Sequence, residues 1–276
     1  MLNICVLASG SSGNATALWN DGGGILIDFG CSRKYIEAVL SSIGCAPGNI
    51  KGIVVTHCHS DHVAPGATLF ARHHNVPFYL HEATYRSLCR GNKCGRFGML
   101  DWNLIHYHSC HPFSVGAFAI TPFATYHTTD GASFGFTVIC PHHDGPFRVG
   151  YITDTGRIDD VMVAALADCR VLVIEANHDP DLVASSFRHP GNKEWVVSDY
   201  GHMNNLDAAE TIIRVRRRSS GEHPLKYVFL AHISRDHNTV EHALNQVRSA
   251  LDKAGMEDIR LIPTYHRRKS AVLKVN

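Results

Sequence analysis

Several features that would set this chain apart from ordinary soluble enzymes are missing from its sequence. No apolar stretch approaches the roughly 20 residues that cross a membrane as a helix. The N-terminal segment MLNICVL lacks a basic leader and is too short for the apolar core of a signal peptide. An excess of one charge is also missing, since the net charge is +1, so any surface that attracts nucleic acid must be local. We therefore expect a cytoplasmic protein without a membrane segment.

Paired cysteines are absent too. The nine cysteines show no C-x-x-C spacing, which argues against a disulfide framework and against a zinc ribbon. Reduced thiols in a cytosolic protein explain this pattern most simply. Histidine, by contrast, is in excess with 20 copies, and imidazole serves proteins as a metal ligand and as an acid–base group.

Four metal-capable side chains fall within six residues of the segment THCHSDH. The segment follows the short apolar run GIVV, which predicts a buried strand with the cluster on the loop at its carboxyl end. Side chains alternate along an extended loop, so His57 and His59 should point the same way and Cys58 away from them. Asp61 and His62 lie beyond the bend and can face a second ion. A polar loop with clustered histidines is the alternative, and it leaves this spacing unexplained.

The pattern H-x-H-x-D-H resembles the signature of the metallo-β-lactamase-fold hydrolases, which hold two metals in a groove along one edge of an αββα sandwich. That family also needs a further histidine, a bridging aspartate and a last histidine. His127, Asp154 and His232 offer them in the family's order, each at or just after an apolar, strand-like run. The resemblance covers nearly the whole chain, and a chain of 276 residues can bury one large core. We therefore expect a single α/β domain of this fold over residues 1–276.

The resemblance implies two divalent ions per chain, with zinc or manganese expected and iron as a further possibility. One ion would be held by His57, His59 and His127, the other by Asp61, His62 and His232, and Asp154 would bridge them. The ions would activate a water that attacks the substrate, and Asp61 would orient this water or take its proton. Asp28 would support the metal loop through hydrogen bonds. Its alternative role is the N-cap of a helix over residues 32–43.

The loop after the first expected strand has the sequence SGSSGN. It is similar to the corresponding loop of the YycJ (WalJ) type within this family, whose members are proposed DNA exonucleases. The resemblance implies that the loop borders the active groove. Its amides and polar side chains would then bind substrate, the candidates being Ser9, Ser11, Ser12 and Asn14. The physical alternative is a plain hairpin turn built from small residues.

Two later stretches also deserve a functional hypothesis. Residues 175–179 (EANHD) resemble an element of the same subfamily, and the physical alternative is a turn into a helix capped by Asp179. His202 is similar to a histidine that nuclease-like members place near the substrate, and we expect it to contact the scissile phosphate or to protonate the leaving oxygen. The helix expected over residues 206–218 could turn its N-terminal amides toward a phosphate.

Basic residues gather in two places away from the ligand pattern. A loop that carries Lys93 and Arg96 could close over a polyanion, although an ordinary solvated loop is the simpler interpretation. The arginines within residues 214–218 are more typical of a solvated helix end than of a nucleic-acid contact. The histidine-rich stretch over residues 106–111 has no partner cluster that would close a metal site, so we expect surface or core histidines there.

The superfamily resemblance leaves the substrate open, because related enzymes include lactamases, thioesterases, lactonases and phosphodiesterases. The YycJ-like features favour hydrolysis of nucleic acid, most simply DNA. The span from Asp154 to His232 is too short for the extra domain that large nucleases of the β-CASP group insert there. The alternatives are a small-molecule cyclic-phosphodiester or thioester hydrolase and a metal-binding regulatory protein without activity. All seven expected ligands are present, which argues against a loss of activity.

Overall fold

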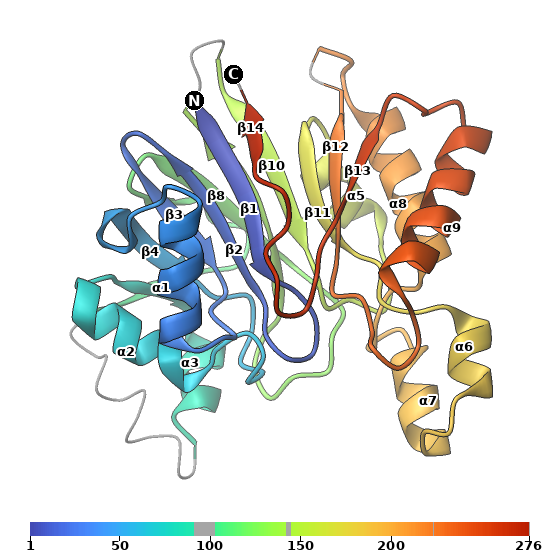
Figure 1. Ribbon diagram of the computed structural model, residues 1–276, viewed down its shortest axis with the longest axis horizontal. Coiled ribbons are helices and arrows are strands. Elements are labelled where there is room, and N and C mark those ends of the chain that lie inside the picture. Colours follow the sequence, from blue (N-terminus) through green and yellow to red (C-terminus); the bar gives the residue numbers. More distant parts are fainter. Residues whose placement is uncertain (91–102, 142–144, 223, 276) are drawn as a thin grey trace.

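Two seven-stranded sheets pack face to face, and helices cover the outer face of each sheet (Figure 1). The computed structural model describes residues 1–90, 103–141, 145–222 and 224–275, so Lys93 and Arg96 lie outside the described residues. The expected αββα sandwich is confirmed by this arrangement. None of the described helices is long and apolar enough to cross a membrane.

The first sheet has the strand order β14-β1-β2-β3-β4-β5-β6. Its strands are β1 (Leu2–Ala8), β2 (Ala15–Asn20), β3 (Gly23–Ile27), β4 (Ile50–Val54), β5 (Phe78–His81), β6 (Leu104–Tyr107) and β14 (Leu273–Val275). The strands β1, β2 and β3 are antiparallel neighbours, whereas β3, β4, β5 and β6 run parallel. The parallel strands end at the same edge of the sheet, where ligand sites of α/β proteins gather.

The second sheet has the order β13-β12-β11-β10-β9-β8-β7. Its strands are β7 (Phe113–Val115), β8 (Phe118–Ala124), β9 (Phe134–Cys140), β10 (Phe147–Ile152), β11 (Val171–Glu175), β12 (Tyr227–Ala231) and β13 (Arg260–Pro263). The strands β10 to β13 run parallel. Because β9 is antiparallel to both β8 and β10, β8 points the same way as β10 and ends at the same edge.

Helices with one apolar face pack on the outer faces of the sheets. The first sheet is covered by α1 (Arg33–Ser42), α2 (Pro65–His74) and α3 (Glu82–Leu88), and the second by α5 (Asp160–Leu166), α8 (Asn205–Arg218) and α9 (Val240–Lys253). The short helices α6 (Pro180–Ser185) and α7 (Pro190–Val196) lie beyond the lower edge of the second sheet in Figure 1, and η1 (Pro47–Asn49) leads into β4. Ile36 and Leu40 of α1 and Phe70 of α2 show the pattern, since all three are fully buried against the first sheet.

The main core lies between the two sheets. Both sheets contribute buried apolar side chains to it, among them Ile4, Val6, Phe136 and Phe229. Tyr107 is buried at this interface and donates a hydrogen bond from its hydroxyl to the Val55 carbonyl oxygen over 2.7 Å. That contact anchors the loop that leaves β4, because Val55 lies directly before it.

One assignment of strands differs from expectation. The apolar runs around Ile259 and Val272 predict two last strands that complete the second layer, but β14 pairs antiparallel with β1 in the first sheet, while β13 alone joins the second. Leu2 faces Val275 in this pairing. The physical gain is at the edge of β1 that β2 leaves open, where β14 supplies hydrogen-bond partners for the backbone.

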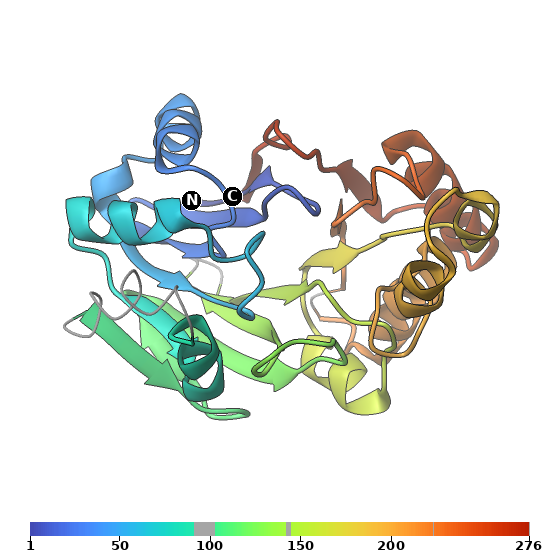
Figure 2. The same cartoon turned by 90° about the horizontal axis from the view of Figure 1, so that it is seen from below.

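The carboxyl ends of β3, β4, β8, β10, β11 and β12 lead into loops on one edge of the sandwich. Figure 2 views the molecule from below and shows the loops from the two layers facing each other there. The side chains of the predicted site follow these strand ends, so both layers supply residues to one place.

Candidate metal centre

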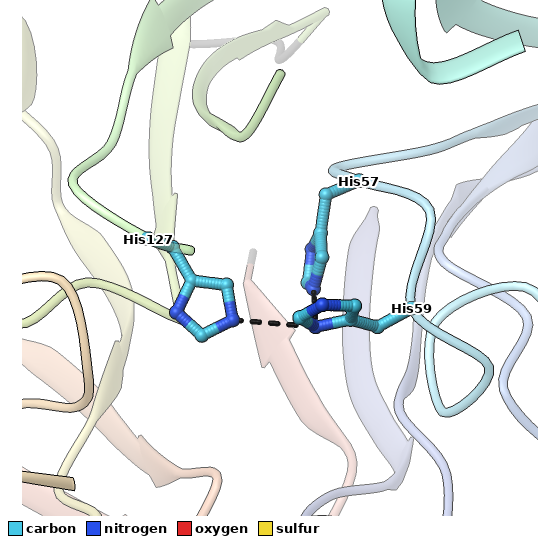
Figure 3. A group of neighbouring side chains, drawn as sticks. All are labelled: His57, His59 and His127. Atoms are coloured by element: carbon cyan, nitrogen blue, oxygen red, sulfur yellow. Dashed lines mark hydrogen bonds between the residues drawn. The ribbon is translucent and has the colours of Figure 1, made fainter. Parts of the chain in front are cut away.

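Three imidazoles from the two layers point toward one another (Figure 3). His57 Nε2 lies 3.0 Å from His59 Nδ1, and His127 Nε2 lies 3.3 Å from the same atom. The second nitrogen of two rings has a partner, since Thr56 Oγ1 is 3.0 Å from His57 Nδ1 and the Gly201 carbonyl is 3.0 Å from His127 Nδ1. With those nitrogens engaged, the converging nitrogens are left to bind a cation.

Burial keeps these three rings uncharged. It disfavours the imidazolium form and lowers the pKa of His57, His59 and His127 below the usual value, most strongly for His57. The neighbouring imidazoles add to the effect, because protonating one ring disfavours protonating the next. A neutral imidazole is the form that ligates a metal ion.

A second group forms around Asp61, His62 and His232. Asp61 Oδ2 lies 3.6 Å from His62 Nε2 and 3.5 Å from His232 Nε2. Behind the two rings stand buried carboxylates: Asp28 Oδ2 accepts from His62 Nδ1 over 2.7 Å and Glu175 Oε1 from His232 Nδ1 over 3.0 Å. These hydrogen bonds fix the proton on Nδ1 and leave Nε2 facing Asp61.

Asp154 joins the two groups. Its carboxylate oxygens lie 3.2 Å from His62 Nε2, 3.7 Å from His127 Nε2 and 3.6 Å from His232 Nε2. Burial would raise the pKa of Asp154, but the charges of His232 and His62 outweigh burial and hold it well below the usual value. The carboxylate is therefore ionised and lies where it could contact ions in both groups.

The donor set fits metal ions. Asp154 Oδ2 and His232 Nε2 are buried at the centre of the site, and neither makes a hydrogen bond of normal geometry. Buried polar atoms without such partners are rare, because losing water without replacement is unfavourable. Imidazole nitrogens and carboxylate oxygens in close groups suit zinc, manganese or iron. The seven ligand assignments and their division between two ions remain a prediction.

Backbone conformation at the strand ends aims three of these side chains. Asp28, Asp154 and His232 have φ angles of 61°, 56° and 52°, in the left-handed region that residues other than glycine adopt rarely. Asp28 and His232 come directly after β3 and β12, and Asp154 comes two residues after β10. The turn ends each strand abruptly and directs the next side chain into the site.

A family model described as the beta-lactamase superfamily domain matches residues 25–233, which include all the candidate ligands. The chain belongs to this superfamily. Its fold is the metallo-β-lactamase fold, and the chain is similar over nearly all its length to the structure of Zn²⁺-bound PqqB from Methylobacterium extorquens. That alignment covers 99% of this chain and 100% of the other, with a TM-score of 0.68 and 13% sequence identity.

Two curated relatives are closer in sequence. The exodeoxyribonuclease YycJ of Bacillus anthracis is 31% identical over 261 residues, which cover 92% of this chain and 90% of the relative. The exodeoxyribonuclease WalJ of Streptococcus pneumoniae serotype 2 is 30% identical over 257 residues, covering 89% of this chain and 88% of the relative. With these relatives and this fold, the chain is a metal-dependent hydrolase of the metallo-β-lactamase superfamily.

Asp28 supports the loop that follows β4 through hydrogen bonds. It is fully buried and accepts hydrogen bonds from the Thr56 amide over 2.9 Å and from the Thr56 hydroxyl over 3.0 Å, besides the one from His62. Its alternative role as a helix cap is wrong, because Ser32 caps α1 through its hydroxyl. Asp28 thus positions His62 directly and His57 through Thr56, whose hydroxyl contacts His57 Nδ1.

Glu175 is a site residue to which sequence reasoning gave no role. It is fully buried, and its Oε1 lies 2.7 Å from His202 Nδ1 as well as 3.0 Å from His232 Nδ1. Burial would raise its pKa, but His202 and His232 outweigh burial and lower the pKa to about 2. The signal in the sequence was the acidic residue at the end of a buried strand. The turn predicted after it is confirmed, since Asp179 caps α6.

His202 lies beside the candidate ligands without belonging to the histidine triad. Its ring stacks on that of His232 at 5.1 Å and meets the edge of Trp195 at 5.1 Å. Since Nδ1 is held by Glu175, Nε2 is the nitrogen left for a substrate. The predicted phosphate contact from the start of α8 is wrong, because Asn204 Oδ1 accepts from the first free amides, those of Leu206 and Asp207.

The SGSSGN loop divides into an inner and an outer part. Ser9 Oγ accepts from the His232 amide over 2.7 Å, and Asn14 Nδ2 lies 2.9 Å from His62 Nε2. Both residues are buried, so they hold candidate ligands rather than present a free surface. Ser11 is exposed and Ser12 partly so, which leaves these two at the outer side of the loop. Whether any of the four binds substrate remains a prediction.

Other residues singled out in the sequence lie outside the candidate ligand groups. Cys58 packs in the core between the first sheet and its helices, with its sulfur 3.1 Å from Thr129 Oγ1, as alternation predicts. His106, His108 and His111 are exposed, as expected. The arginines at the end of α8 form its last turn, and a helix of 14 residues is about 20 Å long, so they lie at the end of α8 far from His202.

Proposed function

We propose that this protein hydrolyses phosphodiester bonds in DNA at a centre of two divalent ions. The observation that carries the proposal is the shared carboxylate of Asp154 between two groups of imidazoles, with His202 beside them. The relatives named exodeoxyribonucleases supply the substrate class. Bound ions would supply Lewis acidity for the hydrolysis.

The residues of the chain supply orientation and proton transfer. Asp61 lies next to both His62 and His232 and is partly exposed, so its carboxylate can accept a proton from the attacking water. Glu175 accepts the hydrogen bond from His202 Nδ1 and so orients the ring, which leaves Nε2 directed toward a phosphate oxygen or the leaving oxygen. Trp195 flanks His202 and limits the access of water on that side.

The test of the reaction uses purified protein reconstituted with Mn²⁺ or Zn²⁺. Substrates are DNA and RNA labelled at the 5′ or the 3′ end, with a thioester and a cyclic phosphodiester as controls. We expect DNA to be shortened from an end at a rate well above that of the controls. Hydrolysis of thioesters without any cleavage of nucleic acid would contradict the proposal.

The role of His202 has its own test. His202→Ala should lower turnover roughly 10²–10⁴-fold, the range of a positioned acid, with metal content unchanged. His111→Ala is the matched control, since His111 is an exposed histidine that belongs to none of the candidate metal groups. If His202→Ala cleaves DNA as fast as the parent, His202 neither donates a proton nor holds the phosphate.

A further inference from the structure

A cavity of about 770 Å³ opens between the N-terminal ends of α1 and α2, and we call it the α1–α2 cavity. Its walls also include Ser12 from the SGSSGN loop and His266 and Arg267 from the segment after β13. The volume lies in the range of about 300–1,000 Å³ that small-molecule sites occupy. None of the candidate metal ligands lines it, so it is distinct from the centre described above.

The cavity adjoins the metal centre. Gly30 lines it, and a Cβ atom at Gly30 would collide with the carbonyl oxygen of Asp61. The Gly30 amide donates to the Asn14 carbonyl, and the Asn14 amide donates to the Asp61 carbonyl, over 2.8 and 2.7 Å. One layer of backbone therefore separates the cavity from a candidate ligand. The cavity and the candidate metal ligands are therefore immediate neighbours.

The charge of the cavity is positive. Arg33, Lys34 and Arg267 line it, and among the described lining residues there is no carboxylate. Arg33 has a partner in Glu37 at 3.2 Å, whereas Lys34 and Arg267 are exposed at the cavity mouth. Such a site favours an anion, and a phosphate is the anion that arginine and lysine bind in nucleic acids.

The two helix starts add a favourable dipole. Both α1 and α2 have 10 residues and begin at the cavity wall, so their N-terminal dipoles favour an anion there, although Ser32 accepts from the Tyr35 amide and Pro65 at the start of α2 has no amide hydrogen. The two helix starts touch, since a Cβ atom at Gly66 would lie 2.6 Å from the Arg33 nitrogen. Independently, Ser12 Oγ and His266 Nδ1 are buried atoms of lining residues and have no hydrogen-bond partner.

The cavity lining also has apolar members. Tyr35 and Leu69 belong to it, and Leu69 is 56% exposed. The Tyr35 hydroxyl donates to the Leu7 carbonyl over 2.8 Å and so fixes the ring. An anion site beside a fixed aromatic ring and an exposed leucine matches a nucleotide, whose phosphate is charged and whose sugar and base have apolar faces.

We propose that the α1–α2 cavity binds the nucleotide next to the scissile bond, with its phosphate beside the two helix starts and near Lys34 and Arg267. This rests on the proposed hydrolysis of DNA. The cavity would supply a local source of affinity for a protein of net charge +1, and would set the register of the strand at the ions.

The test compares two charge-matched double variants of the metal-loaded protein. Lys34→Glu with Arg267→Glu reverses the charge at the cavity, and Arg217→Glu with Arg218→Glu makes the same change at the exposed end of α8. We expect the cavity variant to raise KM for a short single-stranded DNA roughly 10–100-fold with little change in kcat, and the control to stay within about 2-fold. The alanine pair Lys34→Ala with Arg267→Ala should shift KM in the same direction by less, which guards against misfolding of the reversal variant.

Neutral methylphosphonate linkages locate the contact. They are placed one at a time at each phosphate near the scissile bond of the DNA. In the parent, one flanking position should raise KM, and in the cavity variant that position should lose its effect because its partner charges are gone. If the methylphosphonate at that position raises KM equally in the parent and in the cavity variant, the proposal is wrong.

The outcomes separate the inference from the proposed function. If the parent cleaves DNA and both double variants raise KM equally, the cavity has no specific role, and the hydrolysis of DNA still stands. If the metal-loaded parent cleaves no nucleic acid, the proposed function fails and this inference fails with it.

Discussion

The two halves of the candidate metal centre differ in the groups that accept hydrogen bonds from their histidines. In the first half, a threonine hydroxyl backs His57 and a backbone carbonyl backs His127. In the second half, buried carboxylates back both rings, Asp28 behind His62 and Glu175 behind His232. One half is therefore built from neutral groups and the other from anions, although both offer imidazole nitrogens.

This difference appears in the protonation of the rings. Burial lowers the pKa of the three histidines of the first half. Burial also disfavours charge on His62 and His232, but the carboxylates around them, above all Asp154, outweigh it and raise the pKa of both rings well above the usual value. The second half thus depends on its carboxylates, and changing them tests whether the halves are separate sites.

Removing the shared carboxylate should have the largest effect. Asp154→Ala should weaken both halves and lower turnover by more than the roughly 10–100-fold typical of an outer hydrogen-bond partner, because Asp154 faces rings of both halves. His232→Ala should remove one ion and leave the other. Elemental analysis after metal reconstitution counts the ions in each variant.

Asp154→Asn is the control for the backbone, because asparagine tolerates the left-handed conformation at this position better than alanine. Its metal content should also fall. Equal metal loss in Asp154→Ala and His232→Ala would show that the two halves do not bind separate ions. If the parent chain binds at most one ion at metal saturation, the two halves are not separate metal sites.

Substitutions of the carboxylates that accept hydrogen bonds from His62 and His232 should weaken metal binding in the second half only. Asp28→Asn and Glu175→Gln keep the size of each side chain and remove its charge, so each should weaken the second ion about 10–100-fold and spare the first. Competition with a chelator, followed by metal analysis, measures the two affinities. Loss of the first ion in either variant would mean that the carboxylates support the whole centre.

The smallest effect is expected at Cys58, which lies between two candidate ligands in sequence. Cys58→Ser should keep both ions and change turnover less than about 2-fold, with a stability loss of about 1 kcal/mol from the exchanged core contact. Thermal unfolding and metal analysis check both statements. A large loss of metal affinity would show that the sulfur takes part in the centre.

Much of the centre could be predicted from the sequence because its residues follow short apolar strands. The run before His57 and those before Asp154 and His232 are strong local signals, and the structure places these residues together. Glu175 gave a weaker signal, since its partners His202 and His232 are 27 and 57 residues away and no local spacing connects them.

The parts that could not be predicted depend on contacts between distant segments. The pairing of β14 with β1 joins opposite ends of the described chain. The short helices α6 and α7 carry few apolar residues at helical spacing, so their sequences give no clear period. The α1–α2 cavity arises where two helix starts meet, and neither helix indicates the other in sequence.

The left-handed backbone at Asp28, Asp154 and His232 limits which substitutions these positions can accept. Apart from glycine, the residues that tolerate this conformation best are asparagine, aspartate and histidine, which also carry the oxygen and nitrogen atoms suited to metals and hydrogen bonds. Sterics and chemistry therefore select the same few side chains. In a library of random variants, these three positions should accept fewer replacements than His57 or His127. An apolar replacement there would remove the metal ligand or hydrogen-bond acceptor and would also disfavour the backbone conformation that directs the side chain into the site.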